Sequence, residues 1–152
     1  MAAIRKKRVL AGILFAAYLI VLCYFLFFSE EMGRTYSERQ YHYNLVPFKE
    51  IWRFLHYWKK LGIGVVLMNI VGNVAAFVPY GTFLPIFSKR ARSFWRTTLL
   101  GFDFSLCVEL VQLVSKVGSF DVDDLLLNTI GAACGYAVYY SYIHRKKRGK
   151  DK

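Results

Sequence analysis

The sequence predicts an all-α membrane protein: a four-transmembrane-helix bundle with an amphipathic interfacial helix in its first outer loop. The chain has 152 residues, which leaves room for one domain. Hydrophobic residues make up 56% of the chain, more than the roughly 45–50% of a typical soluble domain. Four long apolar runs, and the uneven placement of lysine and arginine between them, complete the basis of this prediction.

The first apolar run covers residues 9–28 and contains neither a charged residue nor a proline. Its length matches the roughly 20 residues that a helix needs to cross the hydrocarbon core of a bilayer. A cleaved signal peptide would have a shorter run and a small-residue cleavage site, whereas this run continues directly into Ser29-Glu30-Glu31. We therefore expect it to stay in the protein as the first membrane span.

Three further runs cover approximately residues 62–87, 97–114 and 125–143. Each is long enough to cross the bilayer as a helix, and Pro79 and Pro85 predict a tilt or a kink in the second span. Backbone polar groups must be satisfied internally in lipid, and four spans cannot close a barrel, so we expect helices.

The orientation follows from the placement of lysine and arginine. Four spans put the N-terminus, residues 88–96 and the C-terminus on one side, which holds fourteen of the 21 Lys and Arg residues. Because the basic side of a membrane protein is cytoplasmic, both termini are expected in the cytoplasm. The sequence thus predicts a multi-pass cell-membrane protein with a basic N-terminus (1–8), a transmembrane domain (9–143) and a basic tail (144–152). Its partner is the lipid bilayer and not nucleic acid, despite a net charge of +11.

The first outer loop is long, and its second half has the pattern of a short amphipathic helix. Apolar side chains recur at helical spacing within residues 47–58, at Phe48, Ile51, Trp52, Leu55 and Trp58. A proline such as Pro47 suits the first turn of a helix. We expect this helix to lie in the outer membrane interface, with its tryptophans at the level of the headgroups.

Polar residues occur inside the predicted spans, where an ionised group costs roughly 2.5–3.5 kcal/mol at the helix centre. At about 1.5 Å per residue, Asn69, Glu109, Gln112 and Asn128 reach similar depths in the outer half of the membrane. Asn73 lies deeper, and the outer loop adds Asp121, Asp123 and Asp124 just above. We expect Asn69, Asn73, Glu109 and Asn128 to face one interior pocket. The alternative is that these side chains only bond to each other and hold the bundle together.

The spacing of these residues is also helical. Asn69 and Asn73 are four residues apart, as are Asp124 and Asn128, so each pair is expected on one face. Asp124 could also cap the helix that follows it. One turn further in, Gly131 and Gly135 form a pair of small residues that allows another helix to approach closely.

Four ordered motifs resemble those of VanZ-like proteins. The first is Asn44-Leu45-Val46-Pro47-Phe48, and the longest spans residues 69–85, from Asn69 to Pro85. Glu109-Leu110-Val111-Gln112 and the acidic motif at residues 121–131 complete the set, so that the resemblance covers roughly residues 43–136. It implies an integral membrane protein of the bacterial cell envelope. The family takes its name from a glycopeptide-resistance cluster, where its member is associated with reduced susceptibility to teicoplanin.

Binding is the first of three functional hypotheses, with no cofactor and no metal. A polar pocket in the outer half would hold a lipid-linked cell-wall precursor or an amphiphilic antibiotic, with the interfacial helix as a lid. Asn and Gln side chains offer both donors and acceptors to sugar or peptide groups. The candidate ligand-binding residues are Asn44, Asn69, Asn73, Glu109, Gln112, Asp121, Asp124 and Asn128.

An enzyme and a transporter are the other two hypotheses. In the enzyme, Glu109 would be a general base and Asp121, Asp123 and Asp124 would hold a divalent cation, acting on an envelope lipid precursor. However, the sequence contains no nucleophile–base pair, glycine-rich phosphate loop or His-Glu metal motif, so an enzyme is the less favoured reading. In the transporter, Glu109 would be a protonatable gate, but the chain has no repeated halves of the kind that transporters use.

Overall fold

The computed structural model describes residues 2–28, 41, 43–116 and 118–148, most of which are helical. Four helices are long: α1 (Ala2–Phe28), α4 (Ile63–Phe87), α5 (Phe94–Ser115) and α6 (Val122–Arg148). Two are short, α2 (Lys49–His56) and α3 (Trp58–Leu61). Two strands of two residues each, β1 (Tyr43–Asn44) and β2 (Phe120–Asp121), pair in parallel.

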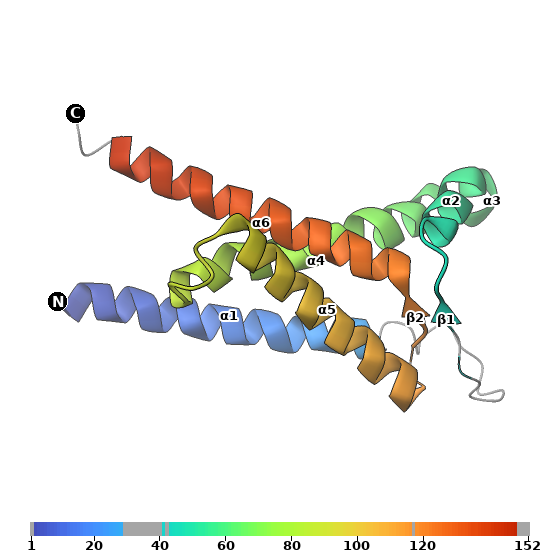
Figure 1. Cartoon of the computed structure of the whole chain (residues 1–152), viewed down its shortest axis with the longest axis horizontal. Helices are drawn as coiled ribbons and strands as arrows, with labels where there is room; N and C mark the ends of the chain where they lie inside the picture. The colour runs from blue at the N-terminus through green and yellow to red at the C-terminus, as the bar shows by residue number, and fades with distance from the viewer. Residues whose placement is uncertain (1, 29–40, 42, 117, 149–152) are drawn as a thin grey trace.

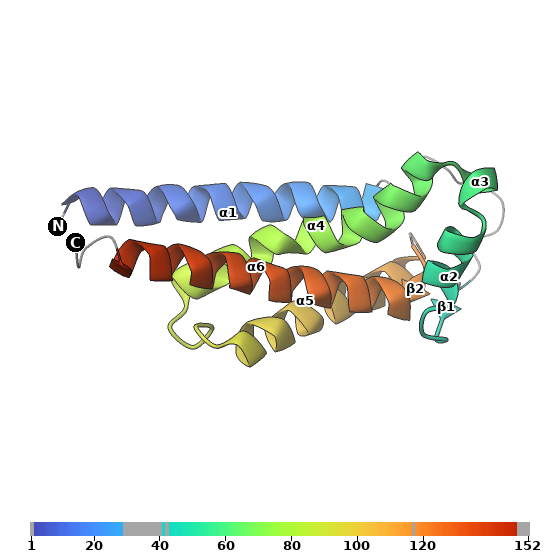
Figure 2. The ribbon, with the colours of Figure 1, turned by 90° about the horizontal axis from the view of Figure 1, so that it is seen from above.

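The long helices run along the length of the molecule, and the short elements gather at one end (Figures 1 and 2). Helix α1 begins and α6 ends at the same end of the molecule. At the opposite end, α2 and α3 lie beside the strand pair. We call the end that carries α2, α3, β1 and β2 the outer end, after the orientation that the sequence predicts.

Three helices of the described chain are long and apolar enough to cross a membrane: residues Val9–Phe27, Ile63–Phe87 and Phe94–Ser115. They coincide with the first three predicted spans. The fourth predicted span is also a helix, but α6 carries Asp123 and Asp124 in its first turn and is not among these three. That α6 crosses the membrane, and that the four helices form a transmembrane bundle, therefore remain predictions.

Helix α6 packs most extensively against α4, and glycines bring the two backbones together. A Cβ atom added at Gly81 of α4 would lie 1.9 Å from the carbonyl oxygen of Ala132 on α6. A Cβ added at Gly131 or Gly135 would meet the carbonyl oxygens of Val74 and Val78 at 2.2 and 2.1 Å. The predicted close approach at the two α6 glycines is confirmed, and its partner is α4. We call this contact the glycine seam.

Helix α1 packs against α4 through aromatic and polar contacts. The Phe15 ring lies 5.8 Å from that of Phe83 and 5.6 Å from that of Phe87, measured between centroids. The Tyr18 hydroxyl donates a 2.6 Å hydrogen bond to the carbonyl oxygen of Ala76. Helix α4 is continuous through Pro79 and Pro85, so the prolines do not divide this span.

The amphipathic segment of the outer loop is helical, but its start differs from the prediction. Helix α2 begins at Lys49, so Pro47 precedes the helix instead of lying in its first turn. The reason is the residue between them, Phe48, whose φ of 65° is left-handed and cannot belong to a helix. Gly62, with φ of 88°, turns the chain from α3 into α4. The position of α2 in the membrane interface remains a prediction.

Candidate functional site

The strand pair joins two parts of the chain that lie far apart in sequence. Tyr43 pairs with Phe120 and Asn44 with Asp121, so the segment before α2 lies directly beside the segment before α6. The side-chain amide of Asn44 donates to Oδ1 of Asp121 at 3.1 Å, and its oxygen accepts from the Val46 backbone N–H at 3.2 Å. Both Asn44 and Asp121 are buried. These bonds fix the chain as it enters the turn before α2.

Asp123, in the first turn of α6, holds the start of α2. Its Oδ1 accepts from the backbone N–H of Phe48 at 2.5 Å, and its Oδ2 accepts from those of Glu50 and Ile51 at 2.8 and 3.1 Å. The first N–H groups of a helix have no partner inside it and favour a negative charge nearby. Because its carboxylate accepts from these N–H groups, Asp123 acts as a cap of α2 that is supplied by another helix. The residue is only 1% exposed.

Glu109 completes this arrangement from α5. Its Oε2 accepts from the backbone N–H of Asp121 at 2.9 Å, and the residue is 3% exposed. Oδ1 of Asp121 in turn accepts from the backbone N–H of Asp123 at 2.8 Å. A continuous network therefore runs from α5 through β2 and the start of α6 to the start of α2. We call Asn44, Glu109, Asp121 and Asp123 the outer clamp.

Burial raises the pKa of the Asp121 carboxyl above its ordinary value of 3.8. The hydrogen bonds from the Asp123 N–H and from Asn44 stabilise its charged form and oppose this effect, but burial is the larger cause. The clamp thus contains one acid whose ionisation is opposed by its surroundings.

Two polar pairs lie below the clamp, between α6 and its neighbours. The amide of Asn73 on α4 donates to Oδ1 of Asp124 at 2.5 Å, and both residues are partly exposed. The amide of Asn128 donates to the hydroxyl of Ser105 on α5 at 2.9 Å. Asn128 is 1% exposed, and its Oδ1 has no hydrogen-bond partner among the described residues.

Gln112 serves a different contact. Its amide nitrogen donates to the backbone carbonyl oxygen of Leu26 at 2.7 Å, which ties α5 to the last turn of α1. The sequence predicts similar depths in the membrane for Gln112 and Glu109, but the two side chains bond to different elements: Gln112 to α1 and Glu109 to β2.

The prediction that Asn69 faces the interior beside Glu109 is wrong. Asn69 is exposed, and its amide donates at 2.8 Å to the carbonyl oxygen of Val65 in its own helix. Depth in the membrane was predicted from position along the helix, and position along the helix does not decide which side a residue faces. Asn73, one turn further in on α4, does face α6, where its amide donates to Asp124.

The cation site considered for the enzyme hypothesis is not formed. Asp121, Asp123 and Asp124 bind to different partners: Asn44, the start of α2, and Asn73. In the described ranges, no three His, Cys, Asp or Glu side chains are grouped so that they could hold a metal ion. Two groups were missed by the sequence analysis: Ser105, and the backbone N–H groups that Asp123 accepts from. Neither has a signal in the sequence, because one serine in a long helix is unremarkable and every residue except proline has a backbone N–H group.

Comparison with known proteins identifies relatives of the chain. A family model described as VanZ/LLP1 matches residues 15–144, a range that includes every residue of the outer clamp. Protein VanZ of Enterococcus faecium is 25% identical over 134 residues, which cover 87% of this chain and 74% of that protein. No solved structure matches the chain.

Proposed function

Because this chain belongs to the VanZ/LLP1 family, we propose that it binds the polar headgroup of an amphiphile at the outer end of its helices. The proposed ligand is a lipid-linked cell-wall precursor or an amphiphilic glycopeptide antibiotic of the teicoplanin type. The proposed setting is the cell membrane, in agreement with the three apolar helices.

The observation that carries this proposal is the division of the outer polar residues into two groups. Asn44, Glu109 and Asp121 are buried and hydrogen-bonded within the protein, so they build the outer end. Asn69 is exposed on α4, and Asn73 and Asp124 are partly exposed one turn further in. We call Asn69, Asn73 and Asp124 the polar strip, and we propose that this strip contacts the ligand.

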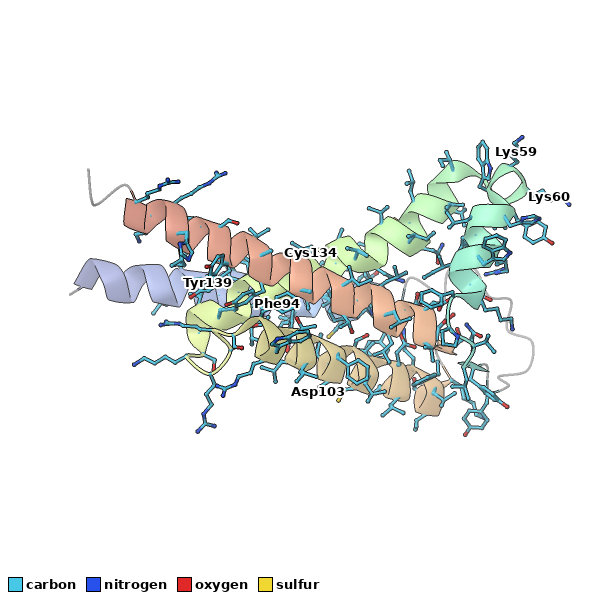
Figure 3. The ribbon with its side chains drawn as sticks, turned by 45° about the horizontal axis from the view of Figure 1, so that its top comes forward. Lys59, Lys60, Phe94, Asp103, Cys134 and Tyr139 are labelled. Atoms are coloured by element: carbon cyan, nitrogen blue, oxygen red, sulfur yellow. The ribbon has the colours of Figure 1, made fainter. Side chains whose placement is uncertain are left out.

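The chemistry around the polar strip suits an amphiphile. Amide and carboxylate groups offer the donors and acceptors that sugar and peptide groups require. Met68 and Val71, 71% and 54% exposed on the same helix, would lie beside the acyl chain of the ligand. Lys59 and Lys60 on α3 lie exposed at the same end of the molecule and would attract a phosphate group (Figure 3).

The binding test compares two exposed residues whose hydrogen bonds, within the described part of the chain, go to their own helix. Asn69 donates to Val65, four residues earlier, and Ser115 at the outer end of α5 likewise donates to Val111. We expect Asn69→Ala to lower the occupancy of a co-purifying amphiphile about fivefold, the effect of roughly 1 kcal/mol from one hydrogen bond. Ser115→Ala is the matched control and should leave occupancy unchanged.

Native mass spectrometry of the protein from mild detergent measures this occupancy, and the melting temperature shows that both variants fold. Equal occupancy in Asn69→Ala and wild type would remove the polar strip from the proposal. In cells, expression of the wild type should reduce susceptibility to teicoplanin, and Asn69→Ala should reduce it less.

We also propose that α6 is a fourth membrane span and that the outer end faces away from the cytoplasm. The common end of α1 and α6 supports this topology, together with the basic residues near both termini. Reporter domains fused after Lys60 and Lys116 should be found outside the cell, and those after Arg96 and Lys152 inside. A cytoplasmic reporter at Lys116 would overturn this topology.

A further inference from the structure

Asp103 lies on the exposed face of α5. The buried residues of this helix lie on the opposite face: Thr97, Gly101, Ser105, Val108, Glu109 and Gln112. Asp103 itself is exposed and lies near the middle of the helix in Figure 3. Within the described part of the chain, its carboxyl group forms neither a hydrogen bond nor a salt bridge.

The depth of Asp103 makes this exposure unusual. It lies nine residues after Phe94, the first residue of α5, which is about 13 Å along a helix that is apolar enough to cross a membrane. If α5 spans the hydrocarbon core, which is about 30 Å thick, the carboxyl group of Asp103 lies inside the core and not at its surface. Ionisable residues at such depth almost always face other protein groups or a water-filled cavity. Arg96 lies two turns away toward the helix start and makes no salt bridge with it.

The residues around Asp103 have the repeat of a helix–helix interface. Exposed side chains recur along this face in alternating steps of three and four residues, at Leu100, Asp103, Cys107, Leu110 and Val114. That is the heptad spacing with which two helices wrap around each other in a left-handed coil, the commonest arrangement of membrane helices. A single polar residue in such a repeat fixes the register and the number of helices.

We propose that this face of α5 packs against α5 of a second copy of the chain, in parallel, with Asp103 opposite Asp103 of the second copy. Two copies in one membrane share one orientation, so their Asp103 residues lie at equal depth. Two carboxyl groups are self-complementary when one of them is protonated, since the protonated group donates a hydrogen bond to the other. Leucine and valine side chains are no more apolar than lipid, so the carboxyl pair supplies the specific contact. This inference does not depend on the proposed ligand.

Cys107 makes the arrangement testable, because it lies one turn beyond Asp103 on the same face. In full-length protein in native membranes, a Cys23→Ser, Cys134→Ser variant retains only Cys107. A Cys23→Ser, Cys107→Ser variant retains only Cys134, an exposed cysteine on α6. Mild oxidation followed by non-reducing electrophoresis should give a disulfide-linked dimer for the first variant and mostly monomer for the second.

Asp103 is then changed in the variant that retains Cys107. Asp103→Leu should lower the yield of dimer about fivefold, the change expected from one hydrogen bond between membrane helices. Asp103→Asn should keep most of it, since an amide also donates and accepts. Melting temperatures near that of the parent show that both variants fold. The proposal is overturned if Cys107 and Cys134 cross-link equally, if Asp103→Leu forms dimer as the parent does, or if the product contains a different protein.

Discussion

Helix α6 is held at two places, the glycine seam and the outer clamp, and different interactions stabilise the two. Along the glycine seam, α6 and α4 meet through backbone atoms, with no room for a side chain at Gly81, Gly131 or Gly135. At the outer clamp, the start of α6 is held by carboxylates that accept hydrogen bonds from neighbouring elements. The seam depends on shape, whereas the clamp depends on charge and on the direction of each hydrogen bond.

The two contacts respond differently to change. A seam formed by close backbone packing cannot open by a small step, because a shift of either helix breaks many contacts together. A clamp made of a few hydrogen bonds at the end of the molecule can open locally while the seam stays closed. We therefore expect changes in the seam to affect the whole fold, and changes in the clamp to affect mainly residues 43–61.

The largest effect is expected for Gly81→Ala, which tests the seam. Its Cβ would lie 1.9 Å from the carbonyl oxygen of Ala132 and force the helices apart. We expect a loss of about 3 kcal/mol of stability, at the upper end of the usual cost of overpacking. Thermal unfolding in detergent measures it.

Gly64→Ala is the control for this change, because a Cβ at Gly64, also in α4, meets nothing within 4 Å. Alanine is favoured over glycine within a helix, so this variant should be as stable as the wild type or slightly more stable. Equal melting temperatures for Gly81→Ala and Gly64→Ala would contradict the close packing of the seam.

A smaller and more local effect is expected for Asp123→Ala, which tests the clamp. The variant leaves the N–H groups of Phe48, Glu50 and Ile51 without their acceptor, at a cost of about 2 kcal/mol. Amide hydrogen exchange should become faster at residues 48–51 but not along the seam.

Glu50→Gln is the control, since the Glu50–Arg53 salt bridge is on the surface and contributes only about 0.3 kcal/mol. If exchange rises equally over α2 and α6 in Asp123→Ala, the clamp is not a separate unit.

The same comparison explains how much of the structure could be predicted from the sequence. The seam follows from composition: long apolar runs predict the helices, and Gly131 and Gly135 predict the close approach. Asn73 was predicted to face an interior pocket and Asp124 to lie just above, at the start of the last span, and the two bond to each other. These features could be predicted because they depend on the size and polarity of the side chains, which the sequence gives directly.

The clamp was harder to predict because its partners are mostly backbone groups. Asp123 was predicted as a cation ligand in the enzyme hypothesis, whereas its role as a hydrogen-bond acceptor depends on where α2 begins. That start is set by the left-handed Phe48, and nothing in the sequence marks a phenylalanine for that conformation. The strand pair of two residues is likewise too short to produce an alternating pattern. The prediction for Asn69 failed for a different reason: position along the helix gave its depth but not the side that it faces, and Asn69 is exposed.

The smallest effect is expected from the titration of Asp121, which distinguishes the clamp from the seam by pH. Burial raises the pKa of this acid in the folded protein above its ordinary value of 3.8. Its contribution to stability is therefore complete below that ordinary value and is lost as the pH rises through the raised value. Asn at position 121 keeps an oxygen that can accept from Asn44 and from the Asp123 N–H, but it does not titrate.

We therefore expect the melting temperature of the wild type to fall relative to that of Asp121→Asn as the pH rises from about 4 toward neutral, and the difference to become constant once Asp121 is ionised. Measuring the difference between the two proteins cancels the titration of the other acids, which both share. The glycine seam contains no titrating group, so Gly81→Ala should lower the melting temperature equally at every pH. A difference between wild type and Asp121→Asn that grows in favour of the wild type as the pH rises would mean that the hydrogen bonds from Asn44 and Asp123 outweigh burial, and that the clamp is strongest when Asp121 is charged.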